Sequence, residues 1–365
     1  MKRKILFIGI FTFVITMTLL IINGGSNVKA DPVYTAGEEN VFSRNPSLPT
    51  GDLSNGADNW YKSDKVTQTK VSFKNIYGMK IVGNLFVPKG LDKTKENPAI
   101  IVGAPFGAVK EQSSNLYAQK MADKGFVTLS FDQVFYGESD GSPKGSVEHD
   151  LYSESFSAAA DYLTTLNYVD NDRIGVLGIC ASGGFSISAA KIDSRLKAIA
   201  TVSMYDLGEM ARSGINNSQS IEQRKANIKA ASDERTAVAN GKPIQYIGGT
   251  PETITPDSDP ISKEFYDFYR TQRGAAGTTT QMTQESSAKF INFYPLEDME
   301  TIAPRPLLFI AGDHAHSLSF SQEAYEKASG PKELYIVKNA GHVDLYDRTD
   351  LIPFEKLDSF FSNNL

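Results

Sequence analysis

The stretch that decides the fold is Arg173-Ile174-Gly175-Val176-Leu177-Gly178-Ile179-Cys180-Ala181-Ser182-Gly183-Gly184. It begins as a short apolar strand, continues as a turn of small residues, and leads into a helix predicted over 185–192. The only cysteine of the protein, Cys180, stands at the turn. This is the pattern G-x-Nuc-x-[GS] of a nucleophile elbow, with a thiol in place of the usual serine hydroxyl.

The residues around Cys180 suit such a turn, because bulky neighbours would clash with its backbone. The following helix points its N-terminus at the turn, and the positive end of its dipole favours a thiolate and a developing oxyanion. The alternative is a structural cysteine, since free cysteine packs well as a small apolar residue. The strand, the small residues and the helix together favour a nucleophile.

Ser182 is the alternative nucleophile within the same stretch. If Ser182 stood at the turn, the strand would run two residues past it and Gly178 would lose its role. We therefore favour Cys180.

The first residues have the pattern of an export signal. The basic segment Lys2-Arg3-Lys4 precedes an apolar segment over 5–22, and Val28-Lys29-Ala30 offers small residues to a signal peptidase. We expect residues 1–30 to be a signal peptide, cleaved near Ala30, and the protein to be secreted or extracytoplasmic. An uncleaved membrane anchor over 5–22 is the alternative, because the segment is long enough to span a bilayer.

The net charge and the cysteine content limit the classes of molecule that the protein can bind. The chain has 365 residues and a formal net charge of −6, and an acidic protein is a poor partner for nucleic acid or an anionic membrane. The single cysteine excludes an intrachain disulfide, and an exported protein with one thiol has a use or a partner for it. We expect a small-molecule substrate, no nucleic acid, and membrane contact only if segment 5–22 is retained.

After the signal we expect an N-terminal extension over 31–64 and one large domain over 65–365. The domain begins with a hairpin over 66–87. Apolar strands then alternate with helices: strands over 99–102, 126–131, 174–178, 197–203, 307–311 and 333–337, and helices over 114–124, 153–167, 185–192, 321–328 and 352–362. This predicts an α/β fold with a mostly parallel sheet covered by helices on both faces. The alternation stops over about 206–304, which we interpret as a lid over the carboxyl ends of the strands.

Four segments together resemble the α/β-hydrolase fold, in its dienelactone-hydrolase-like and polyketide-transferase-like branch. They are Gly103 to Gln112, Phe131-Asp132 with 137–141, the turn at Cys180, and Gly341 to Asp347. The resemblance covers the chain from about residue 65 to its C-terminus. It implies an α/β-hydrolase fold and acyl chemistry.

His342 is predicted to be the general base for Cys180. It follows Gly341 after the last predicted strand, where this fold places its catalytic histidine. The oxyanion hole is predicted from the backbone N–H groups of Ala181, which follows the nucleophile, and of Phe106 in the loop after the first buried strand.

The usual position of the acid that would orient His342 is held by Ala315, which cannot serve, so two other residues are candidates. Asp206 follows the strand next to the turn strand, an alternative position for the acid in this fold, and Asp313 lies just before the usual position. We favour Asp206, and for each aspartate a helix cap or loop carboxylate is the competing role.

The pair His314 and His316 with Asp313 could suggest a metal site, but a metal needs three or four ligands held in geometry. Nothing else in the sequence supplies them. We therefore expect no metal and no cofactor.

The sequence thus predicts an exported acyl hydrolase that attacks ester, lactone or thioester carbonyls through Cys180. Acyl transfer to an acceptor other than water is the second hypothesis, which the polyketide-transferase resemblance implies. A non-catalytic binding protein with the same fold is the third, supported by Ala315. A peptidase is less favoured, because no propeller or second substrate domain is visible in the sequence.

Overall fold

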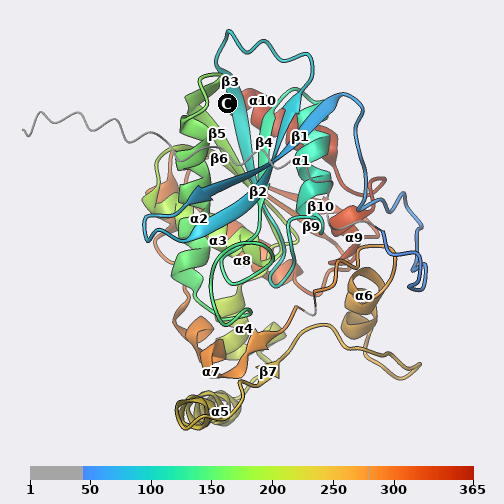
Figure 1. The fold of residues 1–365 in the computed structure, drawn as a ribbon, viewed down its shortest axis with the longest axis vertical. Helices are drawn as coiled ribbons and strands as arrows, with labels where there is room; N and C mark the ends of the chain where they lie inside the picture. Colours follow the sequence, from blue (N-terminus) through green and yellow to red (C-terminus); the bar gives the residue numbers. More distant parts are fainter. Residues whose placement is uncertain (1–43, 279) are drawn as a thin grey trace, which may run out of the picture. The chain divides into compact units, whose positions relative to one another are not determined.

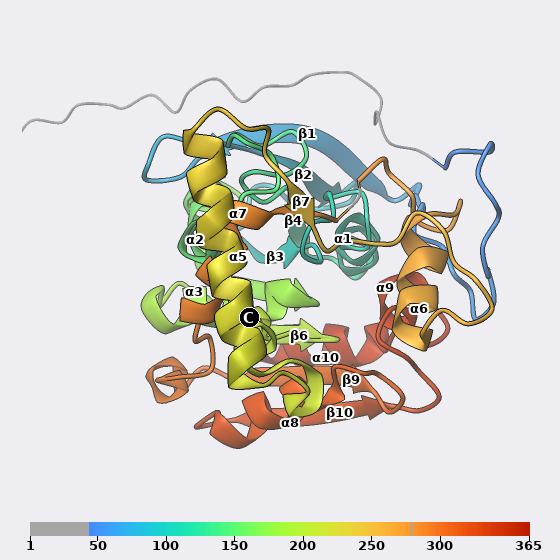
Figure 2. The ribbon, with the colours of Figure 1, turned by 90° about the horizontal axis from the view of Figure 1, so that it is seen from below.

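A central sheet of eight strands organises the protein, in the order β1-β2-β4-β3-β5-β6-β9-β10 (Figures 1 and 2). The computed structural model describes residues 44–278 and 280–365. The strands are β1 (Val66–Lys74), β2 (Lys80–Pro88), β3 (Asn97–Gly103), β4 (Val127–Phe131), β5 (Val169–Ile179), β6 (Leu196–Val202), β9 (Leu307–Gly312) and β10 (Lys332–Val337). β1 pairs antiparallel with β2 and β2 with β4, and the other neighbours are parallel. This confirms the predicted mostly parallel sheet and the hairpin at its edge.

Helices cover both faces of the sheet. α1 (Ser114–Asp123) and α10 (Phe354–Asn364) pack together on one face, and α2 (His149–Thr164) and α3 (Ala181–Ile192) on the other (Figures 1 and 2). α8 (Leu318–Lys327) packs against β9 and β10. Every residue of β4 and the last five of β3 are buried, as strands between two helical layers require.

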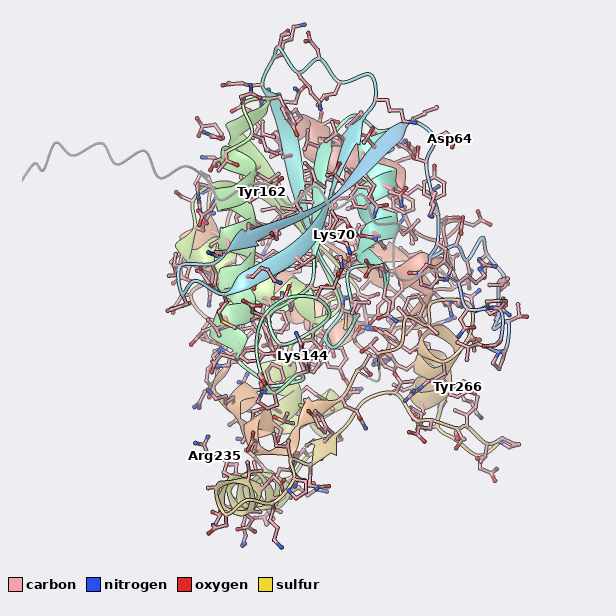
Figure 3. The ribbon with its side chains drawn as sticks, viewed as in Figure 1. Asp64, Lys70, Lys144, Tyr162, Arg235 and Tyr266 are labelled. Carbon is pink, nitrogen blue, oxygen red and sulfur yellow. The ribbon has the colours of Figure 1, made fainter. Side chains whose placement is uncertain are left out.

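The segment between β6 and β9 forms the predicted insertion in the alternating pattern. Its elements are α4 (Leu207–Ser213), η1 (Ile215–Asn217), α5 (Ile221–Ala239), β7 (Tyr246–Ile247), α6 (Pro260–Tyr269), β8 (Met282–Thr283), α7 (Gln284–Ser287), η2 (Ala288–Asn292) and η3 (Met299–Ile302). α5 buries only Ala231. Figure 3 shows Arg235 of α5 at the outer end of the insertion, far from Lys70 on β1.

Residues 44–64, the described part of the predicted extension, lie along the domain and are fixed to it by side chains. The Trp60 indole donates to the carbonyl of Gln272 at 2.9 Å, and the Asn59 amide donates to the carbonyl of Glu111 at 3.0 Å. The predicted signal over 1–30 and the apolar segment 5–22 lie outside the described residues. Among the residues described, no helix is long and apolar enough to cross a bilayer.

Candidate active site

Cys180 occupies a strained turn between β5 and α3. Its backbone has φ +56° and ψ −125°, a conformation that residues other than glycine rarely adopt and that persists where the surroundings enforce it. α3 begins at Ala181, directly after the cysteine, four residues earlier than predicted. A Cβ atom on Gly178 would lie 2.3 Å from the carbonyl oxygen of Ser182, so the close approach of strand and helix requires glycine there.

Ser182, the alternative nucleophile, is turned away from this position. It is fully buried in the first turn of α3, and its hydroxyl donates to the carbonyl of Ala104. It does not line the cavity beside Cys180. The geometry therefore favours Cys180.

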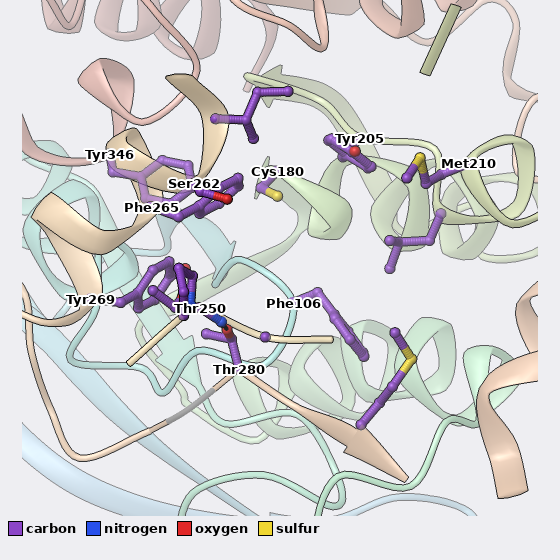
Figure 4. A pocket seen from close by; sticks show the side chains of 15 residues that line it. Phe106, Cys180, Tyr205, Met210, Thr250, Ser262, Phe265, Tyr269, Thr280 and Tyr346 are labelled. Carbon is purple, nitrogen blue, oxygen red and sulfur yellow. Dashed lines mark hydrogen bonds between the residues drawn. The ribbon is translucent and has the colours of Figure 1, made fainter. Parts of the chain in front are cut away.

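The cavity beside Cys180 has a volume of about 330 Å³ and lies under the insertion (Figure 4). Much of its wall is apolar and comes from the insertion, including Leu207, Met210, Ile261, Phe265 and Met282. Six lining residues bear hydroxyl groups and add polarity, and none of the lining residues carries a formal charge: Tyr205, Thr250, Ser262, Tyr269, Thr280 and Tyr346 bear the hydroxyls. The cavity suits an uncharged ligand.

Burial dominates the acidity of Cys180. It raises the pKa of the thiol to about 11, although the Tyr346 hydroxyl and the backbone N–H groups of Ala181 and Phe106 oppose the rise. The start of α3 thus favours the thiolate, as expected, but desolvation outweighs this effect. Because both N–H groups favour a charged sulfur, Ala181 and Phe106 remain the candidates for the oxyanion hole.

A buried ion-pair cluster anchors the loop that carries Phe106. Lys110 is fully buried, and its Nζ lies 2.9 Å from Asp132 Oδ2 and 2.6 Å from Glu138 Oε2. The other oxygen of Asp132 accepts a hydrogen bond of 2.7 Å from the Lys110 backbone N–H. Lys70 reaches Glu138 from β1 at 2.9 Å. These contacts anchor the loop to the sheet and thereby hold the backbone N–H of Phe106 in place.

His342 is fully buried, and both of its ring nitrogens have partners. Nδ1 lies 2.6 Å from Ser317 Oγ, and Nε2 lies 3.0 Å from the Tyr346 hydroxyl. Burial, reinforced by the neighbouring His316, holds the pKa of His342 well below its usual value of 6.5. The imidazole is therefore neutral at physiological pH and able to accept a proton.

The structure does not bring Asp206 or Asp313 to His342. Asp206 caps α4, where its side chain accepts a hydrogen bond of 2.8 Å from the N–H of Glu209. Asp313 points elsewhere, and none of its hydrogen bonds or ion pairs involves His342. Both expectations for the orienting acid are corrected, because the chain turns into a new helix immediately after Asp206 and its carboxylate serves that helix. The Nδ1 partner is the hydroxyl of Ser317.

Asp206→Asn is expected to leave turnover nearly unchanged and to alter the pH dependence of stability. Burial raises the pKa of Asp206 from 3.8 to about 6 in the folded protein. The folded state therefore binds the proton more tightly, so this carboxyl favours folding most below pH 4 and loses that effect as pH rises through 6. The asparagine can still cap α4. The difference in unfolding free energy, variant minus wild type, should therefore increase by about 2 kcal/mol when the pH is raised from 4 to 7.5.

Urea unfolding at the two pH values measures this change, and a steady-state assay measures turnover. A fall in kcat/KM of more than about tenfold would return Asp206 to the catalytic group.

Four residues around His342 escaped the sequence analysis as parts of this site. Ser317 lies two residues beyond Ala315, so the segment expected to supply the partner of His342 does supply it, with a different group. Tyr346 stands four residues after His342, a spacing that places two side chains on one face of a helical turn. That spacing was a usable signal.

The other two residues connect the insertion to the histidine. Glu264 of α6 accepts a hydrogen bond of 2.6 Å from the backbone N–H of Val343 through Oε1. Its second oxygen lies 3.5 Å from Nδ1 of His316, whose ring is tilted by 35° against that of His342 at a centroid distance of 4.6 Å. Glu264 comes from the insertion, whose sequence has no recognisable pattern, and the sequence suggests His316 only as a metal ligand. Within the described residues, no cluster of side chains with metal-ligating geometry is found.

Arg273, also from the insertion, braces the helical turn that carries Tyr346, α9 (Asp344–Asp347). Its guanidinium is buried and donates to Asp347 at 2.7 and 3.0 Å and to the carbonyl of Val343 at 3.0 Å. Asp347 is itself fully buried. Arg273 thus connects the insertion to the segment of His342 and Tyr346 at two points, the Val343 carbonyl and the Asp347 carboxylate.

Comparison with known proteins places this geometry in context. Residues 78–245 match the family model described as X-Pro dipeptidyl-peptidase (S15 family). The chain is 42% identical over 315 residues to the uncharacterized protein PA2218 of Pseudomonas aeruginosa, covering 83% of this chain and 82% of that protein. The crystal structure of that hypothetical protein superposes with a TM-score of 0.81 and 40% identity, covering 87% of this chain and 99% of the other.

More distant relatives have named activities. The chain is 24% identical to the polyketide transferase claH of Penicillium crustosum, over 76% of this chain and 90% of that protein. It is 25% identical to the thiohydrolase aneE of Aspergillus aculeatus, over 77% of this chain and 88% of that protein.

Proposed function

Because the chain belongs to the α/β-hydrolase superfamily, we propose that it is an acyl hydrolase with Cys180 as its nucleophile, acting on thioesters and on activated esters or lactones. One observation carries the proposal. Cys180 stands at a strained turn and lines a largely apolar cavity, and the backbone N–H groups of Ala181 and Phe106 oppose the rise in the pKa of its thiol. That arrangement suits nucleophilic attack on a carbonyl whose oxygen becomes negative.

In the proposed reaction, the sulfur of Cys180 attacks the acyl carbonyl carbon while its proton passes to His342. The N–H groups of Phe106 and Ala181 bind the oxyanion. The tetrahedral adduct then collapses, the leaving thiol or alcohol takes the proton from His342, and an acyl-cysteine remains. Water attacks this thioester with His342 as base, releases the carboxylic acid, and restores the thiol.

The neutral resting state of the site favours activated substrates. A thiolate leaves a tetrahedral adduct much more readily than an alkoxide, because the less basic group leaves faster. With an alkyl ester, the adduct would therefore expel Cys180 again more often than the alcohol. Thioesters and esters of acidic alcohols, including enol lactones, have leaving groups that can compete with the cysteine thiolate, so their adducts go on to the acyl-cysteine.

The cavity indicates the class of acyl group. Its lining includes no cationic side chain that could bind a carboxylate, and Leu207, Met210, Ile261 and Phe265 offer apolar contact. We therefore propose an uncharged, largely apolar acyl group. Burying a free carboxylate there without a partner would be costly.

The test is a matched panel of acyl thioesters and aryl esters with uncharged or carboxylate-bearing acyl chains, assayed with the wild type and with Cys180→Ala. Expected are turnover of the uncharged members and an acyl adduct on Cys180 in the intact mass of the wild type alone. If no member of the panel shows Cys180-dependent turnover, the proposal fails and a non-catalytic binding protein is favoured.

Acyl transfer to an alcohol or amine is the second candidate. It is supported by the low exposure of Cys180, 7%, under the insertion, since a covered acyl-cysteine meets less water. It is also supported by the similarity to the polyketide transferase. Product analysis in the presence of candidate acceptors separates the two reactions: an ester or amide product that forms at the expense of the free acid indicates transfer.

A further inference from the structure

The Tyr346 hydroxyl lies between the two groups that must exchange a proton in the proposed reaction. Its oxygen is 3.0 Å from Nε2 of His342, and Tyr346 lines the cavity beside Cys180. Within the described part of the chain, the hydrogen bonds of the His342 ring go to Ser317 and Tyr346, and neither goes to Cys180. Of these two partners, Tyr346 is the one that lines the cavity with Cys180, so its hydroxyl offers the path from thiol to imidazole.

Tyr346 is held rigidly in this place. Its side chain is fully buried, and its ring packs edge-to-face with Phe268 at a centroid distance of 5.3 Å. The backbone around it is fixed as well: the Tyr346 carbonyl accepts from the Ser113 hydroxyl at 2.9 Å, and the Leu345 carbonyl accepts from the Tyr117 hydroxyl at 2.5 Å. The hydroxyl is thus preorganised between its partners, as groups that act on a reacting atom need to be.

Resting on the proposed function, we propose that Tyr346 is a catalytic residue that carries the proton from Cys180 to His342. As the bond between sulfur and the carbonyl carbon forms, the S–H proton passes to the tyrosine oxygen. The original O–H proton passes to Nε2 of His342 in the same step. The S–H bond and one O–H bond break, an O–H and an N–H bond form, and the tyrosine is neutral before and after.

The two new charges face each other across the site. The imidazolium of His342 forms together with the oxyanion bound by Phe106 and Ala181, so the dry interior never holds one uncompensated charge. When the adduct collapses, the proton returns along the same path. Nε2 of His342 gives its proton to the tyrosine oxygen, and the tyrosine gives its own to the departing thiol or alcohol. His342 and Tyr346 are then both neutral again.

The surroundings of Tyr346 and His342 favour a concerted relay. Burial, with the nearby Cys180 charge, raises the pKa of Tyr346 well above 10, so a free tyrosinate would be a costly intermediate. To accept at Nε2, His342 must carry its hydrogen on Nδ1, and the Ser317 oxygen 2.6 Å away can accept that hydrogen. Ser317 thereby fixes the tautomer that the relay requires.

Tyr346→Phe tests the relay, with Tyr152→Phe as the matched control. Tyr152 is also fully buried, but it does not line the cavity, and its hydroxyl donates to the carbonyl of Ser146. The readout is the rate at which iodoacetamide alkylates Cys180, because this reaction needs the same proton removal and no acyl substrate. At pH 7 we expect Tyr346→Phe to lower the rate by about 100-fold and His342→Ala to do the same, with the control near the wild type.

Two further readouts separate a proton carrier from a structural residue. The deficit of Tyr346→Phe should vanish above pH 11, where the Cys180 thiol, with a pKa of about 11, ionises without help. In mixtures of H₂O and D₂O, the wild-type acylation rate should curve with the deuterium fraction, because two protons move in one step. If Tyr346→Phe alkylates like the control while His342→Ala is slow, the relay is wrong. Equal losses in both phenylalanine variants at every pH would also contradict it.

If Tyr346→Phe does not fold, 3,5-difluorotyrosine incorporated at position 346 keeps the shape and makes the hydroxyl more acidic. The relay then predicts an altered alkylation rate and pH profile, and an unchanged profile overturns it. Alkylation also separates this inference from the proposed function. Absence of acyl turnover in the wild type would count against the function, while the alkylation ratios still decide whether Tyr346 carries the proton.

Discussion

Cys180→Ala is expected to lower kcat/KM for the best thioester substrate by about 10⁴-fold, because no other described nucleophile faces the cavity at the turn. Cys180→Ser should remain at least about 100-fold below the wild type. A serine hydroxyl is far less acidic than a thiol, and His342 here has the hydroxyl of Ser317, not a carboxylate, to stabilise its charged form. Steady-state kinetics with one thioester and one aryl ester measure both losses.

Ser182→Ala is the matched control for these substitutions. Its hydroxyl binds the Ala104 carbonyl inside the domain, so its loss should reduce stability slightly and leave kcat/KM close to that of the wild type. If Cys180→Ala retains activity and Ser182→Ala loses it, the nucleophile has been assigned to the wrong residue.

Arg273→Ala is expected to destabilise the protein by about 3 to 5 kcal/mol, because it leaves a fully buried carboxylate at Asp347 without its partner. Burial already outweighs the arginine and raises the pKa of Asp347 to about 6. Without the arginine the pKa rises further, so the folded variant favours the protonated form still more. Its deficit should therefore grow as pH rises from 5 to 8, which urea unfolding at the two pH values would measure.

A double variant separates the lost ion pair from lost packing. Arg273→Met combined with Asp347→Leu replaces both charges with apolar side chains, and it should recover most of the stability that Arg273→Ala loses. Its turnover should nevertheless fall below that of the wild type, because neither new side chain can donate to the Val343 carbonyl beside His342. A single variant within about 1 kcal/mol of the wild type would contradict the structural role of Arg273.

The sheet was predictable because its signals are local. Apolar runs such as 99–102 and 126–131 can only be buried strands when helices separate them, and the glycines before Cys180 fixed the position of the turn. The start of α3 was misplaced by four residues, because Gly183-Gly184 indicates a turn by propensity. In the structure both glycines are buried in α3, where tertiary context overrides their low helix propensity.

The candidate site was predictable only where a residue's place along the chain determines its role. Cys180, Ala181, Phe106 and His342 follow strand ends, and the parallel sheet gathers those ends at one edge. The partners of His342 depend on side-chain direction, which sequence spacing does not encode. Asp206 has a suitable position and points to α4, whereas the partner hydroxyls come from Ser317 and Tyr346.

The acidity of Cys180 could not be predicted from the sequence for a related reason. A helix N-terminus favours a thiolate, but the extent of burial depends on the insertion, whose sequence has no clear periodicity. Desolvation is a property of the assembled site, so it could not be weighed from the residues around the turn.

The contacts of Glu264 and Arg273 bear on how specificity could be changed in this family. The insertion that shapes the acyl cavity also holds the segment of His342 and Tyr346 through the Val343 N–H and Asp347. A chimaera that takes its insertion from a relative would acquire a new cavity, but it would keep its base in position only if the donor carries a carboxylate and a guanidinium at the same two points. The insertion therefore determines both which acyl group fits the cavity and whether His342 is held in position, so a chimaera must transfer both properties together.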